Sequence, residues 1–145
     1  MHVTVTYNVK SYDFFFKPIF TQFPALQQSL IDDFEAYKAT KKLPHYFGRD
    51  TNYERPADIA GLGLMHIHLA MGGQKLVTPQ GKDINQNTSQ WDRTSNSALL
   101  YAQNIFDENA YSLIALFDPH AHQKARDYER MRLLASYANE FRNAL

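Results

Sequence analysis

The chain has 145 residues, 44% of them hydrophobic and 21% charged, which predicts a single folded domain over residues 1–145 with a sizeable core. Fifteen lysines and arginines are matched by fifteen aspartates and glutamates, so the net charge does not indicate a nucleic-acid-binding protein, and any RNA contact would depend on local basic surfaces. Cysteine is absent, which excludes disulfides, thiolate metal sites and a cysteine nucleophile and agrees with a reducing cytosol.

The chain begins with a polar segment in which every second residue is apolar. Val3, Val5 and Tyr7 alternate with threonine and asparagine, which is the pattern of a half-buried strand. This start lacks the apolar core of a signal peptide, and no apolar run approaches the roughly 20 residues that a membrane-spanning helix needs. We therefore expect a soluble, cytoplasmic protein that does not contact a membrane.

An aromatic segment and a helix follow. Residues 13–24 contain five phenylalanines and two prolines. We expect them to form a hydrophobic flap over the core; the alternative is an exposed aromatic patch that a partner covers. From residue 24 to about residue 42, apolar side chains recur every three or four positions, which predicts a helix (Leu26, Leu30, Phe34 and Tyr37). The helix should end before Pro44, because proline disfavours helix at the preceding residue.

The middle of the chain predicts three further strands and two loops. Residues 45–56 are rich in rings and charges and are expected to form a loop. Leu64–Ala70 reads as a strand, and residues 72–90, rich in glycine and amides, should form a long loop that is functional or mobile. Residues 98–106 and 111–117 predict a β-hairpin. Its second strand is apolar on both faces and should be central in the sheet.

The C-terminal part of the chain is expected to be helical. Asp118 and Pro119 offer an N-cap and a first-turn proline, and apolar residues then recur at helical spacing (Met131, Leu134, Ala138, Phe141 and Leu145). The element order is therefore strand, helix, three strands, helix (β-α-β-β-β-α). This order predicts a small α+β domain, a mainly antiparallel sheet flanked by helices.

Four of the six histidines form two His-x-His pairs. On a strand, alternate residues share a face, so His66 and His68 should point one way and the apolar residues between and beside them the other. Two such imidazoles can serve as general base and general acid, can begin a metal site, or can be surface histidines without a role. His120 and His122 should lie at the start of a helix, where their side chains diverge.

That divergence disfavours a four-histidine metal site, although His122 could still join His66 or His68. We therefore expect neither a catalytic metal nor another cofactor. Arg49, next to a glycine, and Arg93, close to Trp91, suit phosphate binding with base stacking; solvated loop arginines are the simpler alternative. The sequence contains no phosphate loop, nucleophile elbow or dinucleotide turn.

Several short blocks occur in a fixed order along the chain. They are LPHYFGRD (43–50), HIHLA (66–70), RTSN (93–96), LLYAQNIFDENAYSLIALFDP (99–119), His122 and ARD (125–127). In this order they resemble the YafO-type toxins of bacterial type II toxin–antitoxin systems. The similarity extends from about Leu26 to the C-terminus, which leaves residues 11–24 as an aromatic extension atypical of the family.

The resemblance implies a ribosome-dependent mRNA endonuclease with a RelE-like fold that inhibits translation. It implies two partners, mRNA on the ribosome and a cognate antitoxin protein, and no DNA contact by the toxin alone. By position, it also implies roles for a set of polar residues (Arg49, Asp50, His66, His68, Arg93, Thr94, Tyr101, His122, Arg126 and Asp127).

On this basis we expect cleavage of mRNA without a metal. Such a reaction needs a base for the 2′-hydroxyl proton, an acid for the leaving 5′-oxygen and fixed cations for the phosphorane. We assign His66 and His68 to proton transfer, with His122 as an alternative acid. Arg93 is the first choice for the scissile phosphate and Arg49 the second. Base stacking and further substrate contacts are assigned to four residues (Trp91, Thr94, Tyr101 and Arg126).

Three alternatives remain open from the sequence. The first is a metal-dependent hydrolase that uses His66, His68 and His122. The second is a non-catalytic module that binds RNA or the ribosome and blocks translation by occupancy. The third is a partner-binding domain whose interface is the phenylalanine-rich segment.

Overall fold

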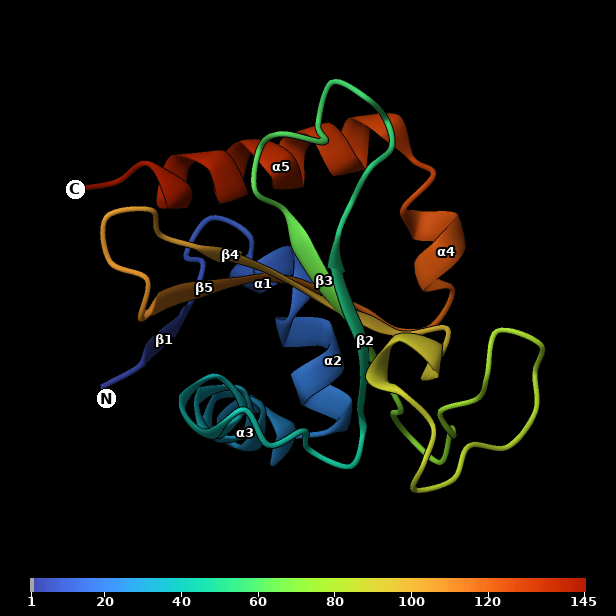
Figure 1. The fold of residues 1–145 in the computed structure, drawn as a ribbon. Coiled ribbons are helices and arrows are strands. Elements are labelled where there is room, and N and C mark those ends of the chain that lie inside the picture. Colours follow the sequence, from blue (N-terminus) through green and yellow to red (C-terminus); the bar gives the residue numbers. More distant parts are fainter. Residues whose placement is uncertain (1) are drawn as a thin grey trace.

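Five strands form one sheet at the centre of the computed structural model, which describes residues 2–145 (Figure 1). The strands are β1 (Thr4–Tyr7), β2 (Phe47–Asn52), β3 (Met65–Leu69), β4 (Ala98–Gln103) and β5 (Ala110–Phe117). They lie in the order β1-β5-β4-β3-β2. The β1–β5 pair is parallel and the other three pairs are antiparallel. The predicted α+β class with a mainly antiparallel sheet is thereby confirmed.

Helices cover both faces of this sheet. They are α1 (Tyr12–Phe15), α2 (Lys17–Gln22), α3 (Leu26–Thr40), α4 (Ala121–Lys124) and α5 (Tyr128–Arg142), with a 3₁₀ turn η1 (Gln90–Asp92). Figure 1 shows α5 along one face of the sheet and α2 and α3 on the other. Within residues 2–145, none of these helices has the length and apolar character needed to span a membrane.

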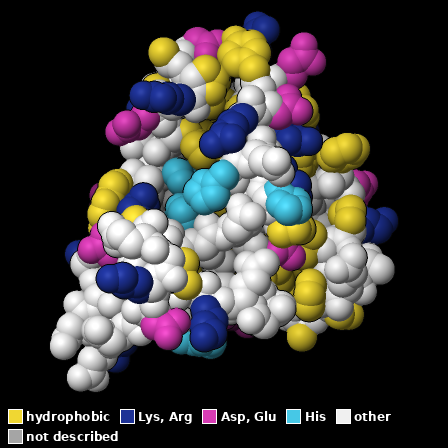
Figure 2. Space-filling model, turned by 90° about the vertical axis from the view of Figure 1, so that its right-hand side faces the viewer, with side chains coloured by type: hydrophobic (Ala, Val, Ile, Leu, Met, Phe, Trp, Pro, Cys, Tyr) yellow, Lys and Arg dark blue, Asp and Glu magenta, His cyan; other side chains and the backbone are white. Residues whose placement is uncertain are grey.

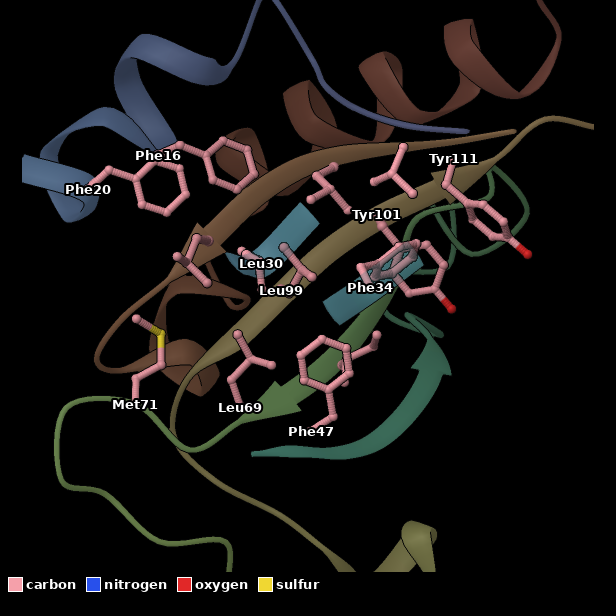
Figure 3. Packing of buried hydrophobic residues seen from close by; sticks show 14 of the residues in the cluster. Phe16, Phe20, Leu30, Phe34, Phe47, Leu69, Met71, Leu99, Tyr101 and Tyr111 are labelled. Carbon is pink, nitrogen blue, oxygen red and sulfur yellow. The ribbon is translucent and has the colours of Figure 1, made fainter. Parts of the chain in front are cut away.

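The first core lies between the sheet and α1–α3 (Figure 3). Leu30 and Phe34, four residues apart on one face of α3, are fully buried in it, and the Phe34 ring packs edge-on against Tyr101 at 5.0 Å between centroids. Phe16 and Phe20 bring the aromatic segment into the same core, as expected for a flap. Helix α3 ends at Lys41, whose backbone is left-handed and whose N–H donates to the carbonyl of residue 37.

The second core lies between α5 and strands β4 and β5. Helix α5 buries residues at helical spacing (Met131, Leu134, Ala135 and Ala138), and they pack with strand residues that include Leu100 and Ile114. The strand members of this core come from β4 and β5, not from β3. The same face of β3 therefore lies beside α5, and its side chains are available to form a site.

Two sequence predictions for the strands are confirmed and one is wrong. The hairpin of β4 and β5 is present, and β5 is an internal strand, between β1 and β4, as its two apolar faces predict. Residues 45–56, expected to be a loop, contain strand β2. Its sequence FGRDTN lacks an alternating pattern because the strand is irregular, with a register shift between Phe47 and Asp50. The observed order therefore has one more strand than β-α-β-β-β-α, and the aromatic segment adds two short helices.

The start of the C-terminal helical region also differs from the prediction. Asp118 does not cap a helix; its carboxylate accepts a hydrogen bond from the Ser97 hydroxyl at 2.5 Å. The short helix α4 begins at Ala121, after His120 in a left-handed conformation. The closing helix α5 is capped instead by Asp127, whose carboxylate accepts from the N–H of residue 130.

Candidate active site

Strand β3 presents two histidines on the face beside α5. Met65, Ile67 and Leu69 pack against the first core, so the predicted alternation is confirmed and His66 and His68 point to the other face. On that face His66 pairs across the sheet with Leu100 of β4 and Thr51 of β2.

Helix α4 adds a third imidazole to the pair. The ring centroids of His66 and His68 lie 5.6 Å apart, and those of His68 and His122 lie 5.8 Å apart. The His66 ring also stacks on Tyr53 at 3.9 Å, with the planes 14° apart. His120, two residues from His122, lines no cavity with this group. The four aromatic rings therefore form a row from Tyr53, just after β2, across β3 to α4.

His68 is the most enclosed of the three histidines, with 6% of its surface exposed. Its Nδ1 lies 3.0 Å from the backbone N of Ser95 and 3.1 Å from the carbonyl oxygen of the same residue. An unprotonated Nδ1 can therefore accept from the N–H, and a protonated Nδ1 can donate to the carbonyl. Burial lowers the pKa of His68 to about 4, and the charges of His122 and Arg49 act in the same direction.

His66 is held neutral for the same physical reason. Burial lowers the pKa of His66 to about 3, and the neighbouring charges of His68, His122 and Arg49 lower it further. Its Nδ1 is buried and makes no hydrogen bond within residues 2–145. A buried imidazole nitrogen without a partner is costly in a purely structural site, which supports a functional use for this ring.

Acidification from about pH 6.5 towards pH 4 is expected to destabilise the fold through these histidines. With a folded pKa of about 4 for His68 and an unfolded value of about 6.5, the unfolded chain binds more protons in this window, so the free energy of unfolding falls as the pH falls. Thermal unfolding at pH 7, 6 and 5 should show that His68→Gln loses less stability over this range than the wild type. Equal losses would contradict a neutral buried His68.

A cleft of about 460 Å³ opens over the three histidines. We call it the histidine cleft, and its walls come from β2, β3, η1, α4 and the residues that follow β2 and α4. Its lining includes His66, His68, His122, Arg49, Thr51, Tyr53, Glu54, Arg55, Trp91 and Arg126. Figure 2 shows histidine side chains gathered at the centre of one face, with lysine and arginine side chains around them.

The charge of the histidine cleft is positive although the chain is neutral. Three arginines line it against one carboxylate, that of Glu54. Within residues 2–145, neither Arg49, Arg55 nor Arg126 takes part in any ion pair. Cations without a carboxylate partner in a concave site attract an anion such as a phosphate.

Arg49 and Trp91 form a platform at one side of the cleft. The guanidinium carbon of Arg49 lies 4.2 Å from the centre of the Trp91 ring, and Nε donates to the Trp91 carbonyl at 2.6 Å. Trp91 remains 57% exposed. Gln90 holds η1 against β2, because its amide donates to the Tyr37 hydroxyl (2.9 Å) and to the Gly48 carbonyl (3.0 Å).

Arg93 and Thr94, both expected to contact substrate, do not line the histidine cleft. The Arg93 guanidinium donates to the carbonyls of Thr88 and Asn85, both at 3.1 Å, and so fastens the 72–90 loop. The hydroxyl of Thr94 donates to the Val77 carbonyl at 2.9 Å, which joins the other end of the same loop. Of the two arginines proposed for the scissile phosphate, Arg49 lines the histidine cleft and Arg93 does not.

Tyr101 also lies away from the cleft, on the face of the sheet that α3 covers. It is 2% exposed, and its hydroxyl donates to Asp50 at 2.6 Å and accepts from Lys38 at 3.0 Å. A nucleobase cannot stack on a ring buried in this way, so the expectation that Tyr101 stacks a nucleobase is wrong. Of the two rings proposed for stacking, Trp91 is the exposed one. Asp50 belongs to the same buried network, and Asp127 caps α5.

The sequence pointed to six residues that the structure brings together in the cleft (Arg49, His66, His68, Trp91, His122 and Arg126). It missed Tyr53, Ser95 and Arg55. Tyr53 and Arg55 follow β2, a strand that carried no periodic signal, and Ser95 acts through its backbone, which no side-chain motif reveals. Within residues 2–145, no group of three or more histidine, aspartate or glutamate side chains is arranged to hold a metal ion.

Comparison with known proteins gives one family and one relative. Residues 35–143 match the family model described as "Toxin YafO, type II toxin-antitoxin system". The sequence is 35% identical over 118 residues to the mRNA interferase toxin YafO of Escherichia coli (strain K12). The alignment covers 79% of this chain and 83% of that protein. No solved structure matches, so the RelE-like kinship stays a prediction.

Proposed function

The chain belongs to the YafO family of toxins from type II toxin–antitoxin systems, and we propose that it is an mRNA interferase whose active site is the histidine cleft. The observation that carries this assignment is the row of His66, His68 and His122 in a cleft lined by arginines that form no ion pair within residues 2–145. Proton-transfer groups and fixed cations in one concave site are what transesterification of RNA requires.

The proposed reaction breaks one phosphodiester bond without a covalent enzyme intermediate. A base removes the proton of the 2′-hydroxyl, the 2′-oxygen attacks the adjacent phosphorus, and the bond from phosphorus to the 5′-oxygen breaks. The leaving 5′-oxygen receives a proton from an acid. The products are a 2′,3′-cyclic phosphate and a 5′-hydroxyl, so no water, metal or oxidant is consumed.

His68 is our proposed base. Its low pKa keeps the ring unprotonated at pH 7. In the tautomer that the proposal requires, Nδ1–H donates to the Ser95 carbonyl rather than accepting from the Ser95 N–H, and Nε2 then has a lone pair for the 2′-hydroxyl proton. The same hydrogen bond persists when the ring becomes charged. His122, the exposed ring at the rim, is the proposed acid. His66 lies between Tyr53 and His68 and shares in proton transfer.

Arg49 is the proposed ligand of the scissile phosphate, and Trp91 beneath it provides an exposed ring on which a base can stack. Arg126 and Arg55 line the same cleft and extend the positive surface along the RNA backbone. The proposed partners are mRNA on the translating ribosome and a cognate antitoxin, which places the activity in the cytoplasm. The domain is proposed to comprise the whole of residues 1–145.

Primer extension on one mRNA, with and without translating ribosomes, tests this function. Cuts that appear only with ribosomes, and that persist after EDTA treatment of the protein, are the expected result. Cuts on naked RNA would refute the ribosome requirement. Loss of cutting after EDTA treatment would favour the metal-dependent alternative, and translation arrest without cuts would favour a non-catalytic module.

A further inference from the structure

A second cavity, of about 600 Å³, adjoins the histidine cleft. We call it the loop cavity, because the 72–90 loop forms one wall and residues 94–96 form the other. His122 lines both the loop cavity and the histidine cleft. An RNA chain with its scissile phosphate at the histidines therefore has this cavity as a neighbouring space for the next nucleotide.

The wall of the loop cavity is held in place by internal bonds. Val77 bridges to Thr94 and to Asp83 by backbone pairing, and the Arg93 guanidinium fastens residues 85 and 88. The arginine that the sequence suggested for phosphate binding thus supports this wall. A cavity with a fixed wall can select among ligands, because a wrong ligand cannot be accommodated by movement of the wall.

Most polar side chains that line the loop cavity already have partners within the chain. Hydroxyl groups of Thr94 and Ser95 donate to carbonyls, and the Thr78 hydroxyl accepts from a backbone N–H. Gln74 accepts from Ser97 at 3.2 Å. By contrast, the exposed Asn96 side chain makes no hydrogen bond within residues 2–145, so both its donor and its acceptor are available.

The backbone fixes Asn96 next to both proposed proton-transfer histidines. The preceding residue, Ser95, hydrogen-bonds His68 through its backbone. The carbonyl of Asn96 itself accepts from the N–H of Ala121, the residue before His122. The free side-chain amide of Asn96 is therefore held close to both histidines: the residue before it contacts His68, and its own backbone carbonyl binds the residue before His122.

We propose that the loop cavity binds the nucleotide next to the scissile phosphate and that the Asn96 amide recognises the edge of its base. This inference rests on the proposed function. An amide presents a donor and an acceptor side by side, and single-stranded RNA is recognised through such contacts to base edges. Asn96 then determines where the enzyme cuts rather than how fast the bond breaks.

The test compares the distribution of cut sites for the wild type, Asn96→Ala, Asn96→Asp and the control Asn87→Ala on ribosome-bound mRNAs whose codons are randomised. Asn87 is an exposed asparagine of the 72–90 loop that does not line the loop cavity. We expect Asn96→Ala to reduce the preference for one nucleotide adjacent to the cut by about 5- to 150-fold, the range of a good amide–base contact. Asn96→Asp, which exchanges the donor for an acceptor, should change the preferred base.

An unchanged preference on both sides of the cut in Asn96→Ala would overturn the inference while leaving the interferase function intact. Complete loss of cutting in both Asn96 variants, with melting temperatures equal to that of the wild type, would also overturn it, because Asn96 would then be needed for catalysis itself. If Asn96→Ala fails to fold, the isosteric Asn96→Asp decides alone. If the folded wild type makes no cuts, the proposed function is wrong, and the inference about Asn96 is then wrong as well.

Discussion

The His68→Ala variant is expected to cleave ribosome-bound mRNA at least about 10²-fold more slowly than the wild type, since a positioned base or acid contributes about 10²–10⁴-fold. His68 is buried in the wall of the cleft, and the Ser95 backbone can donate to an unprotonated Nδ1 or accept from a protonated one, which holds the ring in place. The measurement is the single-turnover rate of cutting at one site, followed by primer extension.

A second substitution separates chemistry from structure at this position. In His68→Asn, the amide can still hydrogen-bond the Ser95 backbone but cannot take a proton at neutral pH. It should lose as much activity as His68→Ala while keeping more of the stability. The control is His45→Ala, an exposed histidine outside the histidine cleft. Wild-type cutting by His68→Asn would mean that His68 only supports the fold.

The orientation of the two histidines on β3 could be predicted because strand alternation is a local rule. Met65, Ile67 and Leu69 are apolar, so burying them fixes where His66 and His68 point. The partner of His66 could not be predicted in this way. Tyr53 reaches the His66 ring only because β2 pairs Thr51 with His66, and that register includes an irregularity near Gly48 that no pattern in the sequence reveals.

The arginine that contacts Trp91 also could not be predicted from neighbouring residues in the sequence. A guanidinium close to an aromatic residue in sequence suggested Arg93 beside Trp91, but the ring pairs with Arg49, 42 residues away. Gly48 explains the proximity: a Cβ there would lie 2.3 Å from the Arg93 carbonyl oxygen, so glycine lets β2 approach the η1 region. The resulting contact depends on tertiary structure alone.

The positive charge of the histidine cleft could not be predicted from the net charge either. The chain has as many acidic as basic residues, yet Arg49 and Arg55, from β2 and the residues after it, line one cleft with Arg126, which follows α4. A sum over the sequence cannot show this clustering. The field that matters to an RNA phosphate is the local one, because charges beyond about 10 Å are screened at ordinary salt.

The Arg49→Ala variant is expected to reduce the single-turnover rate of cutting by about 10²–10³-fold, the cost of losing one group that stabilises transition-state charge. The guanidinium is fixed in advance by the Trp91 ring and carbonyl, so it needs no reorganisation when charge develops on the phosphorane. Because the arginine has no carboxylate partner within residues 2–145, its removal leaves no buried charge behind, and the melting temperature should change little.

Arg49→Lys distinguishes geometry from charge. Lysine keeps the positive charge but cannot present a planar fork or stack in the same way on Trp91, so we expect a rate between those of Arg49→Ala and the wild type. Arg132→Ala, which removes an exposed arginine of α5 outside the cleft, is the matched control and should cut normally. If Arg49→Ala weakened binding in a salt-dependent manner and left the rate at saturation unchanged, Arg49 would contribute only to RNA affinity, and stabilisation of the phosphorane would have to come from Arg126 or Arg55.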